Sequence, residues 1–168
     1  RFKQEVYDAC RDAVLKRLEE PGGFKITLSA QADASGVHGQ AIVHGYADPG
    51  MLLQLMVCER GVLFPGKSGV VIHHDVARAS LTTPMEGLEY VPEANGMTVN
   101  FSRTWQDVER ENSAFLDRME AEGRGHVSRL AVRMDPRQMK VVVILRDRHT
   151  GVVVQAVQCD PSFAEDAG

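Results

Sequence analysis

The stretch "FKITLSAQADASGVHGQAIVHGYA", residues 24–47, decides the fold class of this chain. Over residues 24–32, apolar and polar side chains alternate one by one, as they do in a strand with one buried face. Turn-forming residues follow at Asp33 to Gly36, and the alternation resumes over 37–47. The stretch is therefore predicted to form a β-hairpin.

The rest of the chain continues this pattern, with a helix before the hairpin and one further helix in the second half. Helical spacing of apolar residues predicts helices over residues 2–18 and from Trp105 to about Glu122. Further strands are predicted at 52–59, 62–64 (after a turn at Arg60 and Gly61), 70–81, near Tyr90, and at 97–103, 126–134, 140–147 and 152–158.

This order of elements predicts a mainly β protein, because the strands do not alternate with helices as they do in a doubly wound α/β fold. We expect an antiparallel, immunoglobulin-like β-sandwich with an N-terminal helix and one crossover helix. The expected divisions are an N-terminal helix and linker at 1–23, a β-sandwich domain at 24–159 and a flexible tail at 160–168.

Composition limits the classes of function. The 168 residues are 43% hydrophobic and 25% charged, which is typical of a soluble globular domain. The net charge of -4 argues against nucleic acid as a partner. Basic residues do predominate over 124–158, but that stretch lacks the aromatic side chains on which bases stack.

No apolar run is long enough to span a bilayer, and no signal peptide is visible. The chain opens on Arg1, so we expect a processed or cut chain from which an upstream segment was removed. Its three cysteines, Cys10, Cys58 and Cys159, contain no CxxC pair, which excludes a dithiol centre or zinc knuckle of the usual spacing. Either Cys58 and Cys159 form a disulfide, or all three are small buried side chains, with Cys10 inert on the apolar face of the first helix.

The candidate functional site is the stretch "VVIHHDVARASL", residues 70–81. In an extended strand His73 and His74 point to opposite faces, so one metal ion cannot take both, and no metal site is predicted. Strict alternation places Arg78 on the face of His74 and Asp75 on the face of His73.

Arg78 needs an acceptor in such an apolar context, and Glu59 and Asp75 are the candidates. The arginine then acts either as a polar clamp between strand and loop or as an anion seat for a ligand or partner. The sequence contains no G-x-S-x-G, H-E-x-x-H or P-loop motif, and "PGKSG" at 65–69 has the composition of a turn. No catalytic residue and no cofactor is predicted.

A family resemblance rests on "LLQLMVCERGVLFPGKSGVVIHHDVARASL" (52–81) and "KVVVILRDRHTGVVVQAVQC" (140–159). Together they resemble the C-terminal β-sandwich region of bacterial thioredoxin-like proteins related to the twenty-eight-kilodalton outer-membrane protein family. The matching residues are Glu59, His73, His74 and Arg78, with the hairpin at 140–158.

This resemblance implies a sandwich domain that is exported to the periplasm or cell envelope and accompanies an upstream thioredoxin-like domain. The dithiol of that domain is absent from this sequence, so the resemblance implies no redox activity for the chain itself.

Two functional hypotheses follow. The first is a non-catalytic interaction or accessory domain that binds a protein or cell-envelope partner. The alternative is a hydrolase or metal-dependent enzyme that uses His73, His74, Asp75 and Arg78. The geometry of these side chains discriminates between the two hypotheses, because only the enzyme needs them to face one open concavity.

Overall fold

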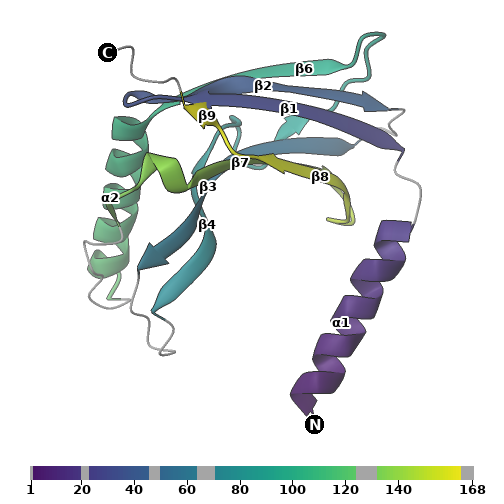
Figure 1. Cartoon of the computed structure of the whole chain (residues 1–168), viewed down its shortest axis with the longest axis horizontal. Coiled ribbons are helices and arrows are strands. Elements are labelled where there is room, and N and C mark those ends of the chain that lie inside the picture. Colours follow the sequence, from purple (N-terminus) through teal and green to yellow (C-terminus); the bar gives the residue numbers. More distant parts are fainter. Residues whose placement is uncertain (1, 20–22, 46–49, 64–70, 124–131, 164–168) are drawn as a thin grey trace.

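The computed structural model describes residues 2–19, 23–45, 50–63, 71–123 and 132–163. Two β-sheets lie face to face, and a helix stands at one end of them (Figure 1). This arrangement confirms the predicted mainly β, sandwich-like fold.

The first sheet is built on the predicted hairpin. Its strand order is β6-β2-β1-β9, and every pair is antiparallel except β1 with β9. The hairpin turn is held by the Asp33 carboxylate, whose Oδ1 accepts hydrogen bonds from the backbone N–H of Ser35 (2.7 Å) and Gly36 (3.0 Å). The strands of this sheet are β1 (Phe24–Ala32), β2 (Gly36–Gly45), β6 (Met97–Thr104) and β9 (Ser162–Phe163).

The second sheet has the order β4-β3-β7-β8, and the short β5 also pairs with β3. Its pairs are all antiparallel, and the β7–β8 hairpin confirms the turn predicted at residues 148–151. The strands are β3 (Met51–Leu63), β4 (Ile72–Ser80), β5 (Leu88–Glu89), β7 (Met139–Asp147) and β8 (Val153–Cys159).

The core lies between the two sheets and is formed by alternate residues of the central strands. Leu53, Leu55 and Val57 of β3 have no exposed surface. The buried ring of Phe101 belongs to the first sheet. It fills the space beside Gly39, because a Cβ on Gly39 would lie 2.6 Å from the Phe101 Cζ. Period-two burial thus explains why the alternating sequence folds as a sandwich.

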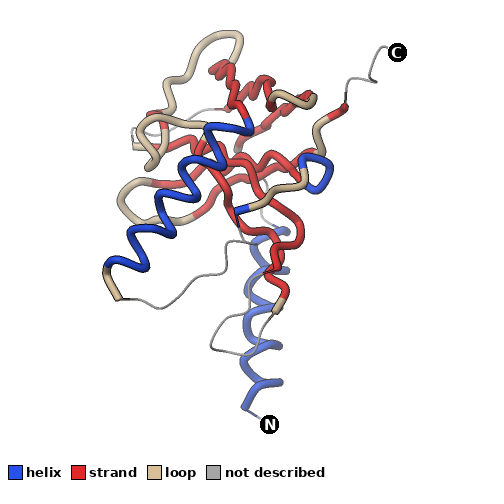
Figure 2. Tube along the Cα trace, turned by 90° about the vertical axis from the view of Figure 1, so that its left-hand side faces the viewer, coloured by secondary structure: helices blue, strands red, loops and turns tan. Residues whose placement is uncertain are grey.

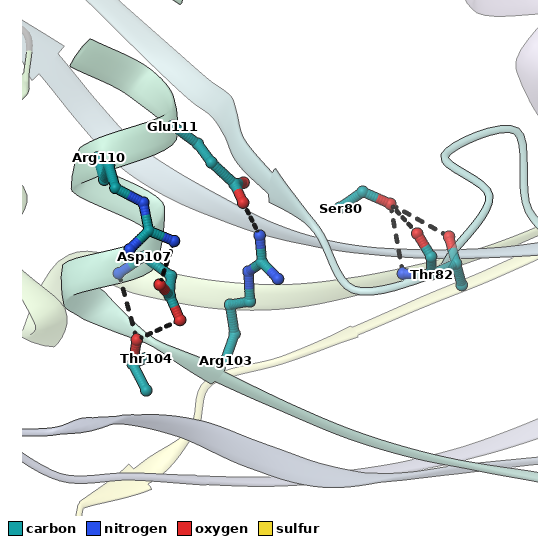
Figure 3. Close-up of polar contacts among 7 residues, drawn as sticks. All are labelled: Ser80, Thr82, Arg103, Thr104, Asp107, Arg110 and Glu111. Atoms are coloured by element: carbon teal, nitrogen blue, oxygen red, sulfur yellow. Dashed lines mark hydrogen bonds and ion pairs between the residues drawn. The ribbon is translucent and has the colours of Figure 1, made fainter. Parts of the chain in front are cut away.

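Helix α2 (Trp105–Ala121) connects β6 to β7 and so is the predicted crossover helix. It begins at Thr104, whose hydroxyl accepts a hydrogen bond from the Asp107 N–H (3.2 Å), a standard N-cap shown in Figure 3. Trp105 and Val108 are buried, and the Trp105 Nε1–H donates to the Asp33 carbonyl (2.9 Å). These contacts fix the helix against the end of the first sheet.

Helix α1 (Phe2–Glu19) confirms the first predicted helix, but it extends away from the sheets (Figures 1 and 2). Val6, Tyr7 and Val14 are all exposed, and so is Cys10. The prediction that Cys10 is buried is therefore wrong, because the described apolar side chains of α1 pack on neither sheet. None of the described helices is long and apolar enough to cross a bilayer.

Three local predictions are corrected or only partly covered. No turn interrupts β3 at Arg60 and Gly61, because β4 supplies partners for Gly61–Leu63. The strand expected at 126–134 lies mostly outside the described residues, and Val132 to Met134 are not a strand. Strand β9 belongs to the segment that was expected to be a flexible tail.

Candidate functional site

Most of the stretch 70–81 forms β4 (Ile72–Ser80), at one edge of the second sheet. Strand β7 pairs with β3 only up to Glu59, whereas β4 continues to pair with β3 as far as Leu63. The outer part of β3 and β4 is therefore a two-stranded ribbon that extends beyond the sheet (Figure 1). We call residues 60–63 and 71–74 the β3–β4 ribbon.

A β-bulge changes the direction of side chains along β4. Val57 pairs with Ala79 and Cys58 pairs with Ala77, so Arg78 is an extra residue on this strand. The bulge lies between Ala77 and Ala79, whereas Val76 pairs with Glu59 and His74 pairs with Gly61, so the register keeps His74 on the side of Glu59, the partner of Arg78. The two side chains differ in burial: Arg78 is buried in the sandwich, and His74 is exposed on the ribbon.

The Arg78 side chain meets Glu59, the last inward position of β3. Arg78 Nε lies 2.9 Å from Glu59 Oε2, and the two side chains are only 5% and 6% exposed. The contact is electrostatic and is not an aligned hydrogen bond. The predicted clamp between Arg78 and Glu59 is therefore confirmed as a buried ion pair.

This ion pair also fastens the segment that precedes β7. The Arg78 guanidinium donates to the carbonyl of Arg133 (3.0 Å) and to that of Val132 (3.4 Å). From the same segment, the Asp135 N–H donates to Glu59 Oε1 (3.3 Å). The pair thus satisfies backbone groups of a segment without strand partners, as buried polar groups require.

Burial dominates the electrostatics of the carboxylate. It raises the pKa of Glu59 above the usual glutamate value, while the charge of Arg78 and the Asp135 N–H act in the opposite direction. Glu109 of α2 also acts on the Arg78 charge. Both partners of the pair are occupied with protein groups, which is the arrangement of a structural clamp.

Asp75, the other candidate partner of Arg78, lies on the outer face of the sheet. It has a left-handed backbone conformation (φ 56°), which is uncommon for a residue other than glycine. Its carboxylate forms an ion pair with Lys140, and hydrogen bonding by Lys140 lowers the pKa of Asp75. Asp75 and Arg78 are therefore not partners, and the structure separates them onto different faces.

The two histidines remain on the ribbon. His73 pairs with Val62 and His74 with Gly61, and His74 Nδ1 lies 3.1 Å from the Arg60 carbonyl oxygen. Among the described residues, no three histidine, cysteine or acidic side chains gather as a metal ion requires. The predicted site residues are thus divided between a buried pair and an exposed ribbon.

The disulfide suggested for Cys58 and Cys159 is not formed, because both thiols are free. Strand β7 lies between the two cysteines, and Cys58 pairs with Lys140 whereas Cys159 pairs with Val141. Because Lys140 and Val141 are consecutive residues, the two thiols point to opposite faces of the sheet. Burial raises the pKa of both thiols, which keeps them protonated and unreactive.

A cleft that the sequence did not reveal opens at one end of the sandwich. Its volume is about 610 Å³, and Arg60, Pro136, Arg137, Met139, Asp160 and Phe163 are among its lining residues. It was missed because residues 160–168 have the composition of a flexible tail. The available signal was Phe163, the single large apolar side chain in that segment.

Comparison with known proteins finds a similar fold. A crystal structure of a domain of the outer membrane lipoprotein Omp28 from Porphyromonas gingivalis matches with a TM-score of 0.55. The two sequences are 12% identical, and the match covers 87% of this chain and 93% of that domain. No family model and no curated protein matches the sequence. At this identity the similarity is one of fold.

Proposed function

We propose that this chain is a non-catalytic interaction or accessory domain of an exported bacterial protein. The observation that carries the proposal is the β3–β4 ribbon. It presents three apolar side chains to solvent, Leu63 (48% exposed), Val71 (48%) and Ile72 (54%). Exposed apolar side chains that gather on one projecting element are typical of a surface that binds a protein.

The geometry gives the enzyme hypothesis no support. That hypothesis needs His73, His74, Asp75 and Arg78 to face one open site. The Arg78 side chain is instead buried against Glu59, and the Asp75 carboxylate pairs with Lys140. The histidines contribute polar groups beside the apolar ribbon, as the rim of a protein interface does.

The fold similarity supports the choice of compartment. The similar domain comes from an outer membrane lipoprotein. A location in the periplasm or cell envelope accords with that similarity and with the sequence resemblance. The thioredoxin-like domain as partner follows from the sequence resemblance alone. The ribbon is the surface we assign to this partner.

Photo-cross-linking in bacterial cells that export the chain tests this function. A photoreactive residue replaces Ile72 on the ribbon, and a matched control carries it at Thr98, an exposed position on the outer face of the first sheet. We expect a discrete adduct with a protein containing a thioredoxin-like domain from position 72 and none from position 98. Equal labelling from both positions, or no adduct from position 72, would contradict the proposal.

A further inference from the structure

The cleft at the end of the sandwich has an apolar floor. Met139 is 1% exposed, and Pro136 and Phe163 line the cleft with it. The volume of about 610 Å³ lies within the range of pockets that hold small molecules. An apolar floor of this size suits a ligand with an aliphatic or aromatic side chain.

The charged groups around this floor differ in how they are engaged. Arg60 forms an ion pair with Asp160. Asp33 accepts hydrogen bonds within the β1–β2 turn, and Asp135 accepts one from the Arg137 backbone N–H (3.0 Å). The charge of Arg60 is therefore balanced by Asp160, whereas the hydrogen bonds to Asp33 and Asp135 leave the negative charges of these two carboxylates in place.

Arg137 is engaged differently from Arg60. Its guanidinium lies 6.0 Å from the centre of the Phe163 ring, a cation–π arrangement that holds it at the cleft. No carboxylate among the described residues forms an ion pair with it. This guanidinium can therefore bind the carboxylate of a ligand, because its planar N–H groups donate two parallel hydrogen bonds to the two carboxylate oxygens.

The balance of charge restricts the ligand further. Three aspartates, Asp33, Asp135 and Asp160, line the cleft against two arginines, so a ligand with several negative charges is repelled. The same aspartates favour a positive group beside the carboxylate. We propose that the cleft binds a zwitterionic amino acid or short peptide with an apolar side chain, its carboxylate on Arg137 and its ammonium group among the aspartates.

This binding site goes beyond the proposed function, because it lies at the end of the sandwich and does not involve the apolar residues of the ribbon. The probe is the dipeptide leucyl-leucine, titrated at low ionic strength into the full chain and followed by calorimetry. Its N-acetylated and C-amidated forms each remove one charge. We expect either modification to weaken binding about three- to fivefold, as exposed ion pairs do.

Two variants locate the carboxylate. Arg137→Gln should weaken binding of the free dipeptide and make it equal to that of the C-amidated form. Arg148→Gln, a matched change in the exposed β7–β8 turn, should leave the difference in affinity between the free dipeptide and its C-amidated form unchanged. The unfolding midpoints of both variants should match the parent, since the change in each lies in an exposed side chain.

The proposal is overturned if leucyl-leucine does not bind at millimolar concentration or if the charge modifications have no effect. It is equally overturned if Arg137→Gln still distinguishes the acid from the amide, or if both variants weaken binding alike.

Discussion

At the scale of single residues, Arg78 decides how the histidine-containing strand is interpreted. A guanidinium among apolar residues on a strand is compatible with a ligand site and with a structural pair. In the structure it contacts Glu59 and two backbone carbonyls, all of them inside the protein. Its role is to hold the segment 132–135 onto the end of the second sheet.

This role predicts a large loss of stability for Arg78→Ala. The change leaves the Glu59 carboxylate buried without its counter-ion, which costs about 3–5 kcal/mol in the free energy of unfolding. Urea denaturation measures this loss directly. Arg148→Ala, an exposed control, should stay within about 0.5 kcal/mol of the parent.

A double variant distinguishes the pair from simple packing. Arg78→Met combined with Glu59→Leu removes both charges at once and should recover more than half of the loss. A parent-like stability for Arg78→Ala would show that the pair contributes nothing to folding.

The sequence predicted this pair but not the position of its members. The need of a buried cation for an acid is general chemistry, and Glu59 was the nearest acid on the preceding strand. The bulge at Arg78 and the left-handed backbone of Asp75 depend on how β3 and β4 register with each other. Period-two alternation contains no information about such an extra residue, so it could not predict that Arg78 and its neighbour Ala79 are both buried.

At the scale of elements, local patterns predicted strands and helices well where they also determine burial. The first hairpin, α2 and the β7–β8 hairpin were all predicted close to their observed bounds. Whether α1 is buried or exposed was not predictable in the same way. Its amphipathic spacing indicates that the segment can form a helix, but it does not indicate what that helix packs against. The strand expected at 126–134 is not formed at Val132 to Met134. The carbonyl groups of Val132 and Arg133 instead accept hydrogen bonds from Arg78.

The β7–β8 turn gives a prediction about pH. Asp147 Oδ1 accepts hydrogen bonds from the N–H groups of Thr150 (2.7 Å) and His149 (2.8 Å), and these bonds lower the pKa of Asp147 below 3.8. A lowered pKa in the folded state adds stability at pH values above 3.8, and this stability is lost as the pH falls through the folded-state value.

Asp147→Asn keeps an oxygen that can accept the same bonds but removes the titration. We expect the parent to lose more stability than this variant between about pH 5 and pH 2, measured by urea denaturation at each pH. Every other carboxyl group is common to the two proteins and cancels in the comparison. Parallel stability curves would contradict the role assigned to the Asp147 charge.

At the scale of the whole molecule, the two sheets with α2 form the folded unit. Strand β9 extends this unit to Phe163, and Pro161 beside it is buried. Helix α1 contributes no described side chain to the core, since its apolar residues Val6, Tyr7 and Val14 are exposed. The sandwich is therefore expected to fold and to interact without α1.

The measurement that tests this central claim most directly is photo-cross-linking from position 72 in a chain reduced to residues 24–168. Its unfolding midpoint should equal that of the full chain, which shows that the sandwich is intact. With the ribbon as the interaction surface, the yield of the partner adduct is predicted to equal that of the full chain. Loss of the adduct from a fully folded 24–168 chain would contradict the assignment of the interaction to the ribbon.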